Sequence, residues 1–69
     1  MNDLREDRVP KLTGGRVKRI RSMLGLNVDQ LAEALGTESN TIRRFERNSE
    51  KLRAVFRYRF LQIEAWFLD

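Results

Sequence analysis

Side chains that bind anions gather in one short segment of this sequence. Arg43, Arg44 and Arg47 lie between residues 40 and 48, with one acidic residue, Glu46, among them. The planar guanidinium of arginine makes forked contacts with phosphate and with guanine. The chemistry offered by this segment is therefore the binding of a polyanion. The alternative is that the charges only solvate one face of a helix.

A second basic segment lies closer to the N-terminus and contains no acidic residue. Its charged residues are Arg16, Lys18, Arg19 and Arg21. The whole chain has 14 basic and 10 acidic residues, a formal net charge of +4 and a sequence pI near 10.3. Eleven of the 14 basic residues are arginine. This excess predicts an anionic partner, and Arg16, Lys18 and Arg19 are candidates for contacts with phosphate.

The residues that are missing exclude most other chemistry. The chain has 69 residues, no cysteine and no histidine, which excludes a disulfide framework, a zinc finger and a Cys or His nucleophile. We expect no enzyme activity, no cofactor and no metal, because no carboxylate pair and no glycine-rich phosphate loop is present either. The longest apolar run is residues 65–68, too short to cross a membrane, and no signal peptide is visible. These features predict a cytoplasmic protein of one small domain.

Apolar spacing predicts three short helices that position the basic residues. Val17, Ile20 and Leu24 recur at steps of three and four, which indicates a helix from about residue 16 to Gly25. A second helix is predicted over 28–35, after an Asn27 cap and before a turn at 36–38. A third follows over 39–48, with two large apolar residues on one face. Residues 1–13 lack a sustained period, so they predict a flexible N-terminal arm ending at a Thr13 cap.

The last segment, residues 49–69, predicts a long aromatic-rich helix that Ser49 could cap. Apolar residues mark more than one of its faces, and a small chain has difficulty covering two such stripes by itself. We therefore expect a homodimer through this helix, or else a helix that folds back so that one core absorbs both stripes. The predicted dimer residues are Phe56, Phe60, Ile63, Trp66 and Phe67.

The predicted elements give an all-α fold of about four helices, divided into an arm (1–13), a helix-turn-helix domain (14–48) and a C-terminal helix (49–69). The segment GLNVDQLAEALG at 25–36, followed by TIRRFE at 41–46, resembles the Cro/repressor (XRE) family of helix-turn-helix regulators. The resemblance covers residues 16–48 and implies a lambda-repressor-like domain whose helix at 39–48 enters the major groove of double-stranded DNA.

Specific roles follow from the resemblance. It implies that Ser39, Asn40 and Arg44 contact base edges, which suits the chemistry of Asn with adenine and of Arg with guanine. Contacts with phosphate are implied for three further residues of that helix, Thr41, Arg43 and Arg47. It also implies a structural ion pair between Arg21 and Glu46. Val28 departs from the family pattern, which often has a phosphate-binding Gln at this position.

The sequence as a whole predicts a DNA-binding transcriptional regulator. We expect a repressor that binds an inverted-repeat operator as a homodimer and acts by occluding the site. The alternative is an antitoxin or adaptor whose aromatic C-terminal helix binds another protein.

Overall fold

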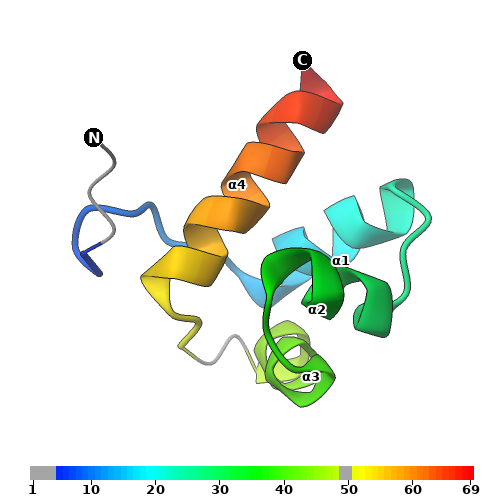
Figure 1. Cartoon of the computed structure of the whole chain (residues 1–69), viewed down its shortest axis with the longest axis horizontal. Coiled ribbons are helices and arrows are strands. Elements are labelled where there is room, and N and C mark those ends of the chain that lie inside the picture. The colour runs from blue at the N-terminus through cyan, green and yellow to red at the C-terminus, as the bar shows by residue number, and fades with distance from the viewer. Residues whose placement is uncertain (1–4, 49–50) are drawn as a thin grey trace.

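The computed structural model describes residues 5–48 and 51–69, which form four α-helices (Figure 1). The helices are α1 (Gly14–Met23), α2 (Val28–Leu35), α3 (Ser39–Asn48) and α4 (Ala54–Leu68). The described residues contain no strand, which confirms the predicted all-α class. Ser49, the predicted cap of the last helix, lies outside the described residues, and α4 begins only at Ala54.

Local hydrogen bonds fix the ends of the first two helices. The Thr13 hydroxyl accepts from the Arg16 amide at 3.2 Å at the start of α1. Asn27 and Gln30 form a capping box at the start of α2, in which each side chain accepts from the other residue's amide, at 2.8 and 2.9 Å. Gly36 ends α2 with φ +77°, a left-handed conformation that favours glycine. These caps are the ones that the sequence predicts.

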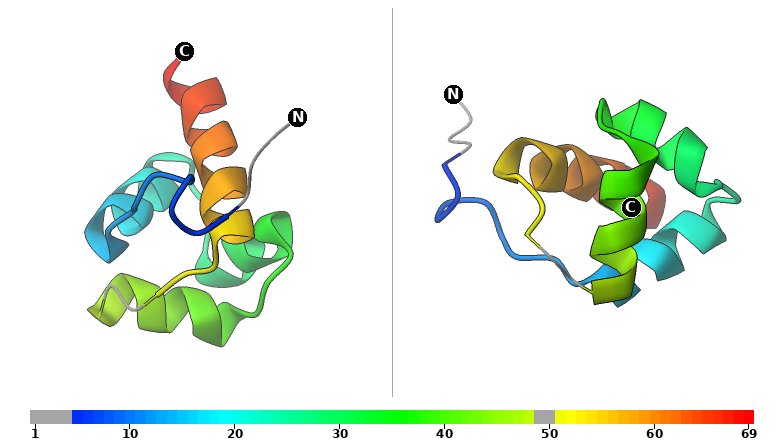
Figure 2. Two further views of the ribbon diagram at one scale, coloured as in Figure 1. Left: turned by 90° about the vertical axis from the view of Figure 1, so that its left-hand side faces the viewer. Right: turned by 90° about the horizontal axis from the view of Figure 1, so that it is seen from below.

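The hydrophobic core lies where α1, α2 and α3 converge, and α4 closes it from one side (Figures 1 and 2). Each helix contributes the apolar residues that recur at helical spacing, because those positions share a face. The fully buried side chains include Val17, Leu31, Leu35, Ile42, Leu52 and Phe60.

The face that α4 turns inward differs from the apolar stripes visible in the sequence. Its buried residues are Ala54, Arg57, Phe60 and Glu64, so two charged residues face the core. Phe60 is completely buried in its own chain and cannot form the predicted dimer interface. The helix folds back on the core, where Arg57 and Glu64 have partners. One core does not absorb both stripes, however, because Leu68 and Trp66 stay exposed.

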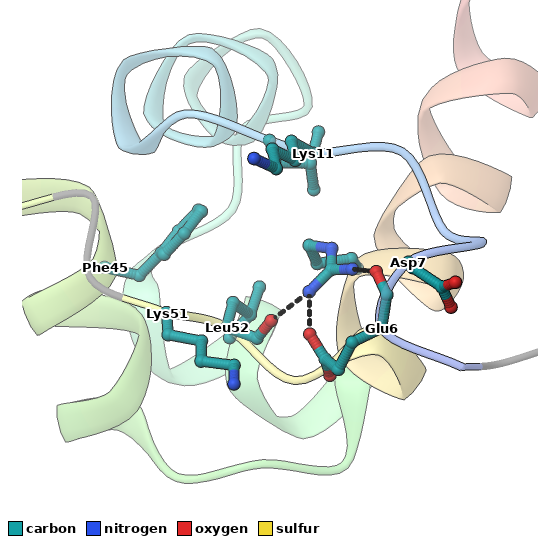
Figure 3. A pocket seen from close by; sticks show the side chains of 8 residues that line it. Glu6, Asp7, Lys11, Phe45, Lys51 and Leu52 are labelled. Atoms are coloured by element: carbon teal, nitrogen blue, oxygen red, sulfur yellow. Dashed lines mark hydrogen bonds and ion pairs between the residues drawn. The ribbon is translucent and has the colours of Figure 1, made fainter.

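Arg57 is held by residues 5–12, which we call the strap. Each of its five N–H groups donates one hydrogen bond: to the carbonyl oxygens of Glu6, Val9, Pro10 and Leu52 and to the Glu6 carboxylate. Figure 3 shows Glu6 and Leu52 joined to the guanidinium by dashed lines. The Glu6 carboxylate also accepts from the Ala54 amide at 2.6 Å, at the first turn of α4. Val9 of the strap is itself buried. A flexible arm is therefore not what the structure shows at 5–13, and residues 1–4 of that predicted arm lie outside the described residues.

Acid should weaken the strap. The hydrogen bond from Arg57, and then the one from the Ala54 amide, lower the pKa of Glu6 below its ordinary value of 4.5. A carboxylate with a lowered folded-state pKa contributes stability above its unfolded pKa, and this contribution is lost as the pH falls through the folded value. As the pH is lowered from about 5 to about 3, we expect the thermal midpoint of unfolding to fall more steeply for the wild type than for Glu6→Gln. Circular dichroism at each pH measures this, with Asp7→Asn as the matched control. Equal slopes for wild type and Glu6→Gln would contradict it.

Close packing of α1 on α3 depends on the absence of a side chain at Gly14. A Cβ there would collide with the Phe45 carbonyl oxygen and would lie 2.8 Å from Glu46 backbone atoms. The next residue, Gly15, has open space around the same position. The two glycines therefore differ in what an alanine would meet.

We expect Gly14→Ala to destabilise the fold by about 2 kcal/mol, because the backbones of α1 and α3 must separate. Gly15→Ala should be neutral or stabilising by up to about 1 kcal/mol, since alanine favours the helix. Urea unfolding of both variants measures the difference. Similar midpoints would show that the two helices are not in close contact at Gly14.

Candidate nucleic-acid interface

The exposed face of α3 carries the side chains that the sequence assigns to DNA. Asn40, Arg43, Arg44 and Arg47 are all exposed, and their spacing places them on one face of the helix. The opposite face buries Ile42 and Phe45 in the core. In Figure 1 and in the left-hand view of Figure 2, α3 lies at one end of the molecule and the C-terminal end of α4 lies at the other. The polar face of α3 is therefore free of other helices.

Arg21 and Glu46 form the ion pair that the resemblance implies. Arg21 Nε lies 2.8 Å from one carboxylate oxygen of Glu46, and Nη2 lies 3.0 Å from the other. Arg21 Nη1 also donates to the Leu26 carbonyl at 3.0 Å. The hydrogen bonds to Glu46 raise the pKa of Arg21. This pair fixes α3 against α1 and the following turn, so it positions the interface, and both side chains are largely buried.

The three residues assigned to base edges lie in different surroundings. Asn40 and Arg44 are exposed, and within residues 5–48 and 51–69 Arg44 has no ion-pair partner. Ser39 is half-buried, and its hydroxyl donates to the Asp29 carboxylate of α2. The Ser39 hydroxyl therefore helps to join α2 to α3 and is less accessible than Asn40 and Arg44.

Three of the residues assigned to phosphate converge between α1 and α3. Lys18, Arg43 and Arg47 line a hollow of about 250 Å³, together with Glu46. Arg43 Nη2 also lies 3.5 Å from an Asp29 oxygen, an exposed pair of small energetic value. Two further residues assigned to phosphate lie outside this hollow. Arg19 is exposed on α1, and Thr41 is half-buried on α3. The hollow is thus a basic groove at the edge of the α3 face.

Arg16 does not belong to this group, contrary to the sequence prediction. Both ends of its guanidinium contact the Glu64 carboxylate, with Nε 2.8 Å from one oxygen and Nη2 bonded to the other. The Arg16 side chain is 41% exposed, whereas that of Glu64 is 8% exposed. Arg16 therefore joins α1 to α4. The only sequence signal for this contact is that Glu64 is the single acidic residue of α4.

Function has to be inferred from this geometry. No family model matches the chain, and comparisons with curated proteins and with solved structures also find no match. None of the helices in the described part of the chain has both the length and the apolar composition that spanning a membrane requires.

The free energy of unfolding distinguishes the structural role of Arg16 from the surface position of Arg19. Arg16→Ala leaves the buried Glu64 carboxylate without a cation, and we expect a loss of about 2 kcal/mol. This is less than for a fully buried pair, because water reaches the Arg16 side. Arg19→Ala, on the same helix, should change stability by less than about 0.5 kcal/mol. Urea unfolding of the two variants measures this. An Arg16→Ala protein as stable as the wild type would contradict this structural role and leave Arg16 as a candidate for contact with phosphate.

Proposed function

We propose that this protein is a sequence-specific regulator that binds double-stranded DNA by inserting α3 into the major groove. The proposal rests on one observation: the free face of α3 presents Asn40, Arg44 and Arg47, while the opposite face is buried. The major groove of B-DNA is wide enough to admit an α-helix. A helix with one buried apolar face and one exposed polar face can present base-specific and phosphate-binding groups together.

The connection between α2 and α3 supports this proposal. The turn at 36–38 joins the two helices, and Gly36 adopts the left-handed conformation that the turn requires. Asp29 of α2 contacts both Ser39 and Arg43 of α3, so the first turns of the two helices are held together. The pair has the arrangement of a helix-turn-helix, in which the first helix supports the second on the DNA. It coincides with the segment that resembles the XRE family.

Each exposed residue of the interface has a role in the proposal. Asn40 and Arg44 contact base edges, where a forked contact contributes about 1–3 kcal/mol of discrimination. Lys18, Arg43 and Arg47 contact phosphates on the side of α3 that faces α1. Because phosphate contacts release counterions, affinity should fall steeply as salt rises. Occlusion of a promoter by such binding would make the protein a repressor.

The test is selection of random DNA duplexes by the purified chain at about 150 mM salt. Enrichment of a defined sequence of a few base pairs would support the proposal. The sequence-based prediction of a homodimer on an inverted repeat would appear as two such half-sites about one helical turn apart. Folded protein that enriches no sequence would contradict the proposed function.

Variants at Arg44 and Arg47 separate base contact from phosphate contact. Arg44→Ala should weaken binding by about 1–3 kcal/mol and relax the preference at one base pair of the half-site. Arg47→Ala should weaken binding to all sequences to a similar degree and reduce the salt slope by about one. Repeating the selection and the salt titration with both variants measures this. Identical sequence profiles for the two variants would overturn the assignment of Arg44 to a base.

A further inference from the structure

A mixed aromatic and polar surface runs along the outer side of α4, opposite its buried face. We call it the α4 outer face, and it comprises Tyr58, Arg59, Gln62, Ala65 and Trp66. Trp66 is 78% exposed, although tryptophan is among the largest apolar side chains. Beside it, Ala34 of α2 and Ile63 complete the lining of an open hollow of about 450 Å³. The surface therefore carries a protruding ring next to a depression.

The composition of this surface is that of a protein interface. Tryptophan, tyrosine and arginine are enriched at interface centres and account for most binding hot spots. The α4 outer face presents one of each, and Arg59 is its only charged residue. The Arg59 guanidinium is already positioned, because Nη1 donates to the Leu35 carbonyl at 2.7 Å at the end of α2. The Arg59 side chain is thus oriented before any partner binds.

We infer that a second copy of this chain occupies the α4 outer face, with the two α4 helices antiparallel. A two-fold interface must be complementary to itself, since the same patch supplies both sides. The protruding Trp66 and the hollow beside it meet this requirement, because rotation about a two-fold axis places each Trp66 over the hollow of the other chain. The dimer residues thus differ from those predicted from the apolar stripes, except for Trp66 and for Ile63 in the lining of the hollow.

Charge complementarity determines the direction of the pair. Arg59 and Asp69 carry opposite charges and lie ten residues apart, so their midpoint along α4 is at residue 64. Gln62 and Trp66 have the same midpoint. An antiparallel pair centred there places Arg59 opposite Asp69 of the second copy and Gln62 opposite its Trp66. A parallel pair would place the two Arg59 residues against each other, which costs energy.

The extent of the contact indicates a weak dimer. Residues 59–69 overlap in this arrangement, a length of about 16 Å at 1.5 Å per residue. Such a contact, even with the α2 hollow, lies at the low end of interface sizes. We therefore expect association at micromolar concentrations and a monomer at high dilution.

The antiparallel arrangement has a consequence that rests on the proposed function. The α3 helix lies at the end of the molecule away from the last turn of α4 (Figure 2). Reversing one α4 relative to the other therefore places the two α3 faces at opposite ends of the dimer. Such a dimer holds two separate DNA segments and does not span two half-sites of one inverted repeat.

Sedimentation equilibrium of the whole chain between about 5 and 500 µM tests self-association without DNA. We expect a monomer–dimer equilibrium, at least a tenfold larger dissociation constant for Trp66→Ala, and a several-fold larger one for Asp69→Lys. Met23→Ala is the matched control, because Met23 is also a large exposed side chain, at 55%, but lies on α1. Circular dichroism confirms that the variants fold. A wild type that stays monomeric, or a Trp66→Ala protein that dimerises normally, would overturn the proposal, and the surface would then be open to a different protein.

Cross-linking distinguishes the direction, because the natural chain has no cysteine. Ala65 and Tyr58 lie on the same side of α4, two turns apart. In the antiparallel pair, Ala65→Cys lies near its own copy and should form a disulfide-linked dimer on oxidation, whereas the Tyr58→Cys residues are too far apart. Cross-linking of both variants would indicate a parallel pair and overturn the antiparallel assignment.

The DNA consequence has a separate readout. A biotin-labelled duplex bearing the selected half-site should retain a second, fluorescent duplex through the wild-type protein but not through Trp66→Ala, which still binds one duplex. Selection of an inverted repeat with half-sites one turn apart would support DNA binding and contradict the antiparallel dimer. Dimerisation with no selected sequence would leave the dimer in place and contradict only the proposed function.

Discussion

The buried guanidinium of Arg57 determines how the two ends of this chain are assembled. All five of its N–H groups are satisfied, four by carbonyl oxygens of the strap and of Leu52 and one by Glu6. A charge at this depth is tolerated only when its donors are paired, so the strap must follow α4 closely. Together with Glu64 and its partner Arg16, this site fixes which face of α4 points to the core. Phe60 then enters the core between two charged residues of its own helix.

The DNA-binding proposal depends on a second set of constraints, which keep α3 rigid. Gly14 allows the backbones of α1 and α3 to approach, the Arg21–Glu46 pair joins the same helices, and Asp29 joins α3 to α2. A base contact requires a side chain to be held within a fraction of an ångström, so a recognition helix fixed on two sides is better suited than one on a mobile loop.

The two proposed surfaces lie on different helices and share no residue. The α3 face is basic and polar, whereas the α4 outer face is aromatic with one cation. A protein that binds DNA through α3 and its own copy through α4 can bring two DNA segments together. Because the contact between copies is short, concentration would control this activity without a ligand.

Apolar spacing and capping chemistry are local, so the sequence is sufficient to predict α1, α2 and α3, the caps at Thr13, Asn27 and Gly36, and the polar face of α3. It also indicated the Arg21–Glu46 pair, through a resemblance covering the helices that contain both residues. The sequence does not predict where α4 begins. The inward face of α4 and the packing of the strap on Arg57 depend on tertiary contacts. The partners concerned, Arg16 with Glu64 and Glu6 with Arg57, are 48 and 51 residues apart. In a helix that is apolar on more than one face, the apolar pattern does not select an orientation, so the buried charges and their distant partners select it.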